Sequence, residues 1–174
     1  MVYGKEWRKS RWFANPFSEG HKWVWSCFFR QKVKGINRSA RWPVSASCHC
    51  VMPENIHFHA DDLNNFQSFG IYYQAFATIR IGKGTYIGPN VGLITQNHNL
   101  TNPDERGEAL PIELGCKCWV GMNSVILPGV MLGDHTVVGA GSVVTKSFPE
   151  GNVVIAGNPA KVLKQIEKQA LEID

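Results

Sequence analysis

Aliphatic residues recur at every sixth position through much of the chain. From Ile81 the sequence divides into the blocks IGKGTY, IGPNVG and LITQNH, and from Leu114 it continues as LGCKCW, VGMNSV, ILPGVM, LGDHTV, VGAGSV and VTKSFP. Each block begins with an aliphatic residue, glycine usually follows, and the fifth position is mostly small or β-branched. A fixed short period of this kind is the sequence signature of a stacked, solenoid architecture.

The direction of the side chains explains the six-residue period. Because side chains alternate along a strand, the fifth residue of one block and the first of the next point to the same side, and the sixth points away. Each block therefore predicts a short strand and a turn, and stacked coils bury the aliphatic rows that one strand cannot bury alone. We predict an all-β parallel β-helix with Cys118 inward and with Val125, Val137 and Val143 outward.

The period is interrupted between Leu93 and Leu114. Taking residues 108–113 as a block with Ile112 inward leaves a polar insertion at residues 99–107. His98 is the sixth residue of the block before that insertion, and Asn97 takes the inward fifth position. We therefore expect His98 to point outward from a rigid strand beneath a long loop, and long loops on rigid scaffolds often carry function.

Both ends of the chain depart from the repeat. Residues 1–50 predict an N-terminal arm and cap, residues 51–157 the β-helix with its insertion, and residues 158–174 a short C-terminal helix. In that helix Asn158 suits the N-cap, Pro159 the first helical position, and Val162, Ile166 and Ala170 follow at helical spacing.

The net charge of +4 conceals two unlike segments. Up to Trp42 ten Lys and Arg residues face Glu6 and Glu19, about +8, whereas the remainder carries about −4. Basic residues beside Trp and Phe suit an anionic bilayer surface, but these aromatics can also cap the open end of the solenoid. We favour the cap, and we leave open a peripheral contact with the inner face of the membrane.

Localisation and metal content follow from other features. The densest apolar stretch, residues 23–29, is far shorter than the roughly 20 residues of a spanning helix, and no signal-peptide pattern opens the chain. We expect a cytoplasmic protein with reduced cysteines and no nucleic-acid partner. The Cys-x-Cys spacings are unlike the usual zinc pattern, so we expect no metal.

Three motifs carry a family resemblance: "IGPNVGLITQNH", "WVGMNSVILPGVMLGDHTVVGAGSVVTK" and "AGNPAKVL". With them the chain resembles the hexapeptide-repeat acyltransferases, and in particular the saccharide O-acetyltransferases of the galactoside/maltose acetyltransferase and capsular polysaccharide type. The resemblance implies a left-handed β-helix with three faces per coil. It also implies a homotrimer with active sites between subunits.

The resemblance also implies roles for individual residues. His98 would be the general base, a task that suits imidazole because its ordinary pKa lies near neutrality. The oxyanion and acyl pocket would be formed by Trp119, Gly121 and Met122. Coenzyme A would be held by Gly139, Ala140, Thr145, Lys146, Lys161 and Lys164. Many family members have aspartate or proline where this chain has Asn99, so the group that orients His98 stays open, with Glu108 and Glu113 as candidates.

These residues predict an O-acetyltransferase that uses acetyl-coenzyme A as acyl donor and a saccharide hydroxyl as acceptor, in surface polysaccharide biosynthesis. An amine, a serine hydroxyl or an antibiotic is the nearest alternative acceptor. Two other classes stay open: a zinc-dependent, carbonic-anhydrase-like β-helix and a non-catalytic scaffold. The carbonic-anhydrase class needs three histidine ligands, and the pair His57 and His59 has no evident third partner.

Overall fold

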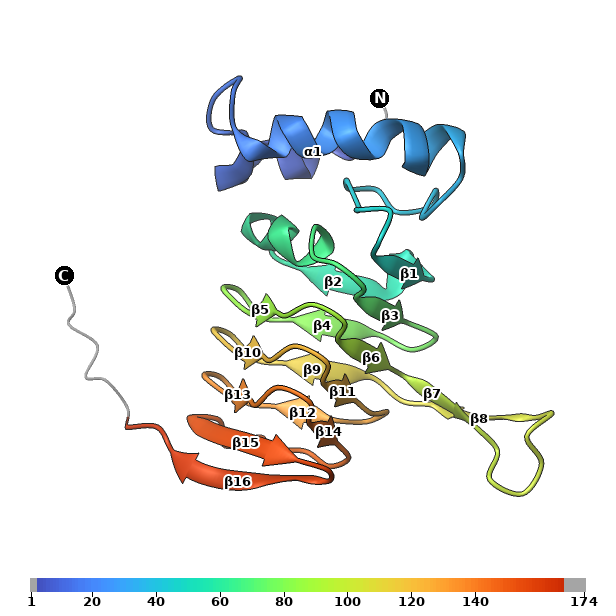
Figure 1. Cartoon of the computed structure of the whole chain (residues 1–174), viewed down its shortest axis with the longest axis vertical. Helices are drawn as coiled ribbons and strands as arrows, with labels where there is room; N and C mark the ends of the chain where they lie inside the picture. The colour runs from blue at the N-terminus through green and yellow to red at the C-terminus, as the bar shows by residue number, and fades with distance from the viewer. Residues whose placement is uncertain (1–2, 168–174) are drawn as a thin grey trace.

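The computed structural model describes residues 3–167, which form a parallel β-helix with an N-terminal helical cap (Figure 1). Sheet A contains β1 (His49–Val51), β3 (Tyr72–Gln74), β6 (Gly92–Ile94), β11 (Val125–Ile126) and β14 (Val143–Val144). Sheet B contains β2 (Ile56–Phe58), β4 (Ile79–Ile81), β9 (Ile112–Leu114) and β12 (Met131–Leu132). Sheet C contains β5 (Tyr86–Ile87), β10 (Trp119–Val120), β13 (Val137–Val138), β15 (Val153–Gly157) and β16 (Ala160–Gln165).

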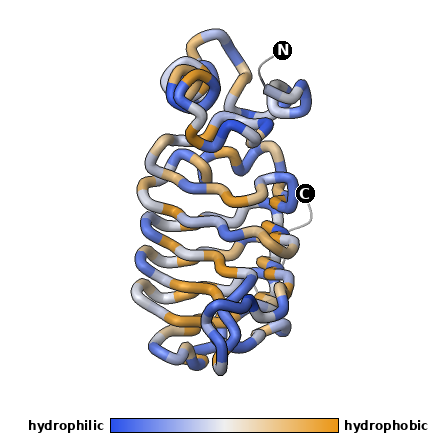
Figure 2. Tube along the Cα trace, turned by 90° about the vertical axis from the view of Figure 1, so that its right-hand side faces the viewer, coloured by the Kyte–Doolittle hydropathy of each residue, from blue (hydrophilic) through white to orange (hydrophobic). Residues whose placement is uncertain are grey.

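The chain passes from sheet A to B to C in each coil, so the molecule has three edges, which we call A–B, B–C and C–A after the sheets that meet there. Strands of successive coils pair in parallel and in register, as Gly92, Val125 and Val143 do along sheet A. Figure 2 shows the coils stacked one on another, with hydrophobic segments recurring at similar places. The parallel β-helix predicted from the six-residue period is thus confirmed.

The inward positions of the repeat are buried as predicted. This holds for the first residues of the blocks (Ile81, Ile87, Leu93, Leu114, Val120, Ile126, Leu132, Val138 and Val144) and for the fifth (Thr85, Val91, Cys118, Ser124, Val130, Thr136 and Ser142). The buried hydroxyls are satisfied locally, since Thr85 and Thr136 donate to the carbonyls of Gly115 and Gly133, each at 2.7 Å. Small hydroxyl residues therefore fill this row without leaving an unpaired polar group.

The N-terminal segment folds over the first coil. It consists of 3₁₀ turns at Lys5–Lys9 and Arg11–Phe13, helix α1 (Glu19–Phe28) and a π-helical turn at Phe29–Val33. Trp7 stacks on Phe58 of β2 with ring centroids 4.7 Å apart. The buried amide of Gln31 donates to the carbonyl of Trp42 at 2.9 Å and accepts from the amide of Val44 at 3.1 Å. Helix α1 lies across the end of the solenoid in Figure 1.

Further 3₁₀ turns lie at Pro53–Asn55 and Ala60–Phe66, within the first coil. Within residues 3–167, no helix combines the length and the hydropathy needed to cross a bilayer.

The predicted C-terminal helix is wrong for the residues that the structure describes. Ala160–Gln165 is strand β16, which pairs antiparallel with β15 after a turn at Asn158 and Pro159, and Val162 lies opposite Ile155. The free edge of β15 offers backbone partners to the whole segment, and Gly157 at φ 106° provides the reversal that a residue with a Cβ resists. Ala170 lies outside the described residues.

The interruption of the repeat is wider than residues 99–107. The coil ends at Thr95, which is fully buried, and Asn97 is exposed, contrary to its predicted inward position. From Gln96 the chain leaves the solenoid as an antiparallel hairpin of β7 (Gln96–His98) and β8 (Arg106–Ala109). The six-residue period ends at Thr95 rather than at His98. From Gln96 the backbone pairs with the returning strand β8 instead of with a neighbouring coil.

Candidate active site

The β7–β8 hairpin leaves the solenoid at the A–B edge, and hydrogen bonds of Thr95 hold the point where it begins and ends. The hydroxyl of Thr95 donates to the carbonyl of Gln74 at 2.6 Å and accepts from the amide of Ala77 at 3.1 Å. The Thr95 carbonyl in turn accepts from the amide of Leu110 at 2.8 Å, where the hairpin returns to the coil. Because both ends of the hairpin are fixed at this buried residue, its strands project at a defined angle from the solenoid.

Arg106 ties the outer strand of the hairpin to the coil. It pairs with His98 across the hairpin, and its guanidinium carbon lies 4.6 Å from the ring centroid of Phe76. A cation over an aromatic face at this distance is attracted by the ring quadrupole. The contact thus holds β8 against the A–B edge, beside His98.

His98 is exposed, and its ring is oriented by the hairpin itself. Its Nδ1 lies 2.7 Å from the carbonyl oxygen of Pro103. Since a carbonyl can only accept, Nδ1 carries the hydrogen and donates, which leaves Nε2 as the unprotonated nitrogen of the neutral ring. The orienting group is Pro103 rather than the predicted Glu108 or Glu113, and Glu113 lies instead 3.9 Å from Arg80.

Asn99 acts on the hairpin tip. Its side-chain oxygen accepts from the amide and the hydroxyl of Thr101, at 2.9 and 2.8 Å, and from the amide of Asn102 at 3.3 Å. The Asn102 side chain donates to Glu105 at 2.9 Å. These bonds fold the segment that carries Pro103, so Asn99 positions His98 indirectly. Sequence reasoning missed Pro103, although the Asn-Pro-Asp run at residues 102–104 is a turn signal.

The second group of predicted residues lies around the C–A edge. Trp119 stands 58% exposed on the outer side of sheet C, in register between Tyr86 and Val137. The amide of Gly121 donates to the carbonyl of Val138 at 2.8 Å, so it is already used within the coil. Within residues 3–167, the amide of Met122 has no hydrogen-bond acceptor. Of these two amides, only that of Met122 is therefore available to a ligand.

The turns of the C–A edge stack too closely for side chains at their glycines. A Cβ at Gly121 would lie 2.6 Å from the amide nitrogen of Ala140, and one at Gly139 would lie 2.8 Å from the Cβ of Ala156. Lys161 on β16 lies opposite Ala156, so it borders this edge. The edge therefore combines small residues, a free amide and a cation.

The other predicted coenzyme A residues are divided between the edges. Lys164 lies opposite Val154 on sheet C. Thr145 and Lys146 follow β14 and lie on the A–B edge, with the Lys146 ammonium 5.6 Å from the ring centroid of Phe148. Sheet A separates His98, Thr145 and Lys146 from Trp119 and Met122. One chain does not bring the two groups together.

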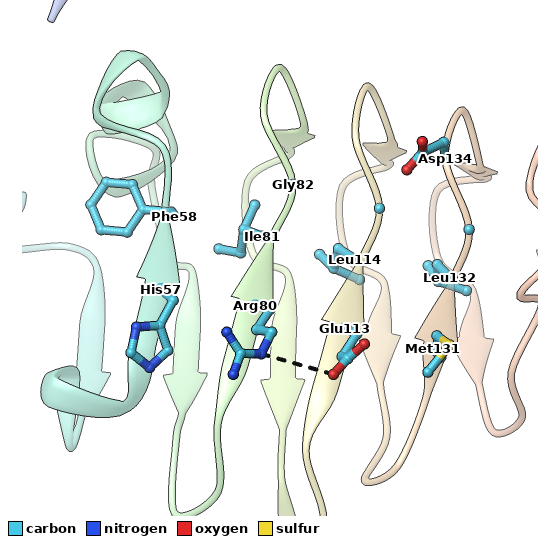
Figure 3. Close-up of a pocket in the computed structure, with 12 residues that line it drawn as sticks. His57, Phe58, Arg80, Ile81, Gly82, Glu113, Leu114, Met131, Leu132 and Asp134 are labelled. Atoms are coloured by element: carbon cyan, nitrogen blue, oxygen red, sulfur yellow. Dashed lines mark ion pairs between the residues drawn. The ribbon is translucent and has the colours of Figure 1, made fainter.

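The outer face of sheet B carries a separate hollow (Figure 3). The hollow is lined from successive coils by His57, Arg80, Glu113 and Met131. The ion pair between Arg80 and Glu113 partly balances the charges of these two side chains. Apart from Glu113, a candidate for orienting His98, none of the residues predicted for the acyl-transfer site lines this hollow. Among residues 3–167, no group of three or more His, Cys, Asp or Glu side chains is placed to hold a metal ion. Burial raises the pKa of the Cys118 thiol, in keeping with its place in the core.

Comparison with known proteins first defines the class. The family model described as bacterial transferase hexapeptide (six repeats) matches residues 111–146. A solved hexapeptide-repeat acetyltransferase of Vibrio cholerae, in complex with acetyl coenzyme A, is 28% identical with a TM-score of 0.54, covering 68% of each chain. The resemblance to the hexapeptide-repeat acyltransferases predicted from the sequence is thus confirmed, and it supports the left-handed β-helix.

Particular relatives follow within this class. The galactoside O-acetyltransferase of Escherichia coli is 40% identical over 106 residues, which cover 59% of this chain and 52% of the relative. A putative colanic acid biosynthesis acetyltransferase of Escherichia coli is 42% identical over 87 residues, 50% of this chain and 47% of the relative. The chain spans about half the length of these curated relatives.

Proposed function

We propose that the protein transfers the acetyl group of acetyl-coenzyme A to a hydroxyl of a saccharide. The observation that carries the proposal is the hydrogen bond from His98 to Pro103, because it fixes the tautomer whose Nε2 can accept a proton. The galactoside and colanic acid relatives support a saccharide acceptor, and the acetyl-coenzyme A complex supports the donor. The colanic acid relative also supports a role in surface polysaccharide biosynthesis.

The reaction is a direct transfer with His98 as general base. Nε2 removes the proton of the acceptor hydroxyl as its oxygen attacks the thioester carbonyl carbon. The Met122 amide donates to the oxyanion of the tetrahedral intermediate, a form of stabilisation that is often a large catalytic term. Collapse of the intermediate breaks the carbon–sulfur bond, and the imidazolium returns the proton to the leaving thiolate. The Pro103 carbonyl stabilises the imidazolium by accepting from Nδ1.

The C–A edge suits the coenzyme A substrate. Gly139, where the stacked turns admit no side chain, and the exposed Ala140 keep large side chains off this edge, which suits an extended arm. Trp119 offers an aromatic wall to the acyl group, and Lys161 and Lys164 supply charge for phosphate. Because His98 lies on the A–B edge, a second copy of the chain has to bring its C–A edge to His98. We propose a homotrimer with one site at each contact, in which Thr145 and Lys146 of one subunit face the coenzyme of the next.

A thiol-release assay with acetyl-coenzyme A and a panel of mono- and oligosaccharides tests this function. We expect saccharide-dependent thiol release that falls by about 10²- to 10⁴-fold in His98→Ala, the usual contribution of a general base. His57→Ala is the matched control, an exposed histidine on sheet B, and should keep wild-type activity.

The outcomes separate the alternatives. If no saccharide supports thiol release but an amine, serine or an antibiotic does, the acceptor is not a saccharide, while the proposed transfer chemistry is retained. Equal activity of wild type and His98→Ala would contradict the role of His98 as base. No thiol release with any acceptor would support a non-catalytic scaffold.

A further inference from the structure

The capping helix has an outer side that the solenoid does not cover. On the inner side of α1 and its π-helical extension, Cys27 and Gln31 are buried. On the outer side Trp25, Phe29 and Val33 are 80%, 56% and 58% exposed, and they follow at four-residue spacing. We call these three residues the outer stripe. Large apolar side chains so gathered on one helix face mark an interaction site.

The surroundings of the outer stripe are basic. The sequence contains six Lys and Arg residues between Glu19 and Glu54 and no acidic residue. Lys22 is engaged by Glu19 at 2.6 Å, and Lys32 donates to the carbonyls of Arg38 and Ala40. Arg30 and Lys34 are exposed and make no ion pair within residues 3–167, and the Lys34 ammonium lies 5.6 Å from the Phe29 ring. These two cations are available to an anionic partner.

The stripe lies at the end of the molecule. Helix α1 crosses the end of the stacked coils in Figure 1, and Figure 2 shows the same helix nearly end-on above them. Because its inner side packs toward the first coil, its outer side faces away from the solenoid. A helix in this position can lie along a flat surface while the coils stand above that surface.

We propose that the outer stripe binds the surface of an anionic phospholipid bilayer. Trp25 and Phe29 enter the interfacial region, where aromatic side chains are favoured, and Arg30 and Lys34 meet the headgroup phosphates. A second copy of the chain is a poorer partner. A two-fold contact through this stripe would bring together two N-terminal segments that each carry about +8, and these segments would repel each other.

Flotation with vesicles tests the proposal, using equal parts of phosphatidylcholine and phosphatidylglycerol and, separately, phosphatidylcholine alone. We expect the full chain to float with the mixed vesicles and far less with the neutral ones, and added salt should weaken the binding. The double variant Trp25→Ser/Phe29→Ser should lose binding by about tenfold or more, since each aromatic buries a large apolar area. Arg30→Gln/Lys34→Gln should lose about tenfold on the mixed vesicles only.

Phe69→Ser is the matched control, because Phe69 is 67% exposed but lies outside the cap. It should bind vesicles as the wild type does, and circular dichroism should show that all variants fold. Wild-type protein that ignores both vesicle types would overturn the proposal, as would undiminished binding of Trp25→Ser/Phe29→Ser. A lower molecular mass of that variant in light scattering, with no vesicle binding by either protein, would assign the stripe to a subunit contact. The assay contains no acetyl-coenzyme A, so its failure is distinct from a failure of the proposed function.

Discussion

Gly121 shows how tightly the turns of the C–A edge are stacked. The Cβ of an alanine there would meet the Ala140 nitrogen at 2.6 Å, a contact that requires backbone movement. We expect Gly121→Ala to lower the free energy of unfolding by about 1–3 kcal/mol, the usual cost of overpacking, and to displace the neighbouring Met122 amide. Urea denaturation and the thiol-release assay measure the two effects.

Gly92→Ala provides the comparison at this scale. The Cβ would lie 3.7 Å from the nearest heavy atom, an ordinary contact, so stability should change by less than about 0.5 kcal/mol. Equal destabilisation by the two alanines would show that loss of glycine, rather than the close approach of the turns, is responsible.

The residue scale also shows where sequence reasoning stops. Counting sixes predicts that His98 points outward, and His98 is exposed, but so is Asn97, because both residues lie on the hairpin rather than in the coil. The partner of the His98 ring is a main-chain carbonyl five residues away, and every residue type has such a carbonyl. The choice between Gly121 and Met122 likewise depended on which amide the neighbouring coil already uses.

The β7–β8 hairpin is the element on which activity should depend most. Asn99→Ala removes the three hydrogen bonds that the Asn99 side chain accepts at the tip, and with them the support of Pro103. Because the tip packs outside the core, we expect an unchanged urea midpoint but a kcat lower by about tenfold, as small losses of orientation are costly in catalysis. KM for acetyl-coenzyme A should be unaffected.

Asp104→Ala is the control within the same tip, since Asp104 is exposed and only its backbone amide makes a hydrogen bond there. It should leave kcat at the wild-type value. A loss of kcat equal to that of Asn99→Ala would mean that general disturbance of the tip, rather than the support of Pro103, sets the rate.

At the level of elements, regular repetition was predictable and departures from it were not. The coils follow from the six-residue period because each block faces the same neighbours. The segment after Gly157 has helical spacing, yet it forms β16, since the open edge of β15 outweighs that local preference. The sequence predicted a loop where the hairpin lies. The strands of the hairpin pair with each other rather than with a neighbouring coil, so they do not follow the six-residue period.

At the scale of the whole molecule, the outer face of sheet A lies between the two groups of predicted site residues, and it is aliphatic at β11 and β14. Val125 and Val143 form part of it in register with Gly92, and all three are partly exposed in the single chain. If this face joins subunits, Val125→Lys places a charge in the contact, where an unpaired charge is costly. We expect light scattering to show a monomer in place of a trimer, with thiol release lost.

Met131→Lys is the whole-molecule control, because Met131 is 44% exposed on the outer face of sheet B. It should leave the trimer and the activity intact. A trimer that survives Val125→Lys, or is lost equally in Met131→Lys, would remove sheet A as the contact.

The antiparallel strand β16 also limits how the molecule can grow. A parallel sheet edge can be extended by a strand of another molecule, and a solenoid has such an edge where each sheet ends. At the end of sheet C the outermost strand runs against the direction of the others. An incoming coil therefore meets a reversed strand there, and end-to-end fibre formation through sheet C is interrupted by the chain's own last described strand.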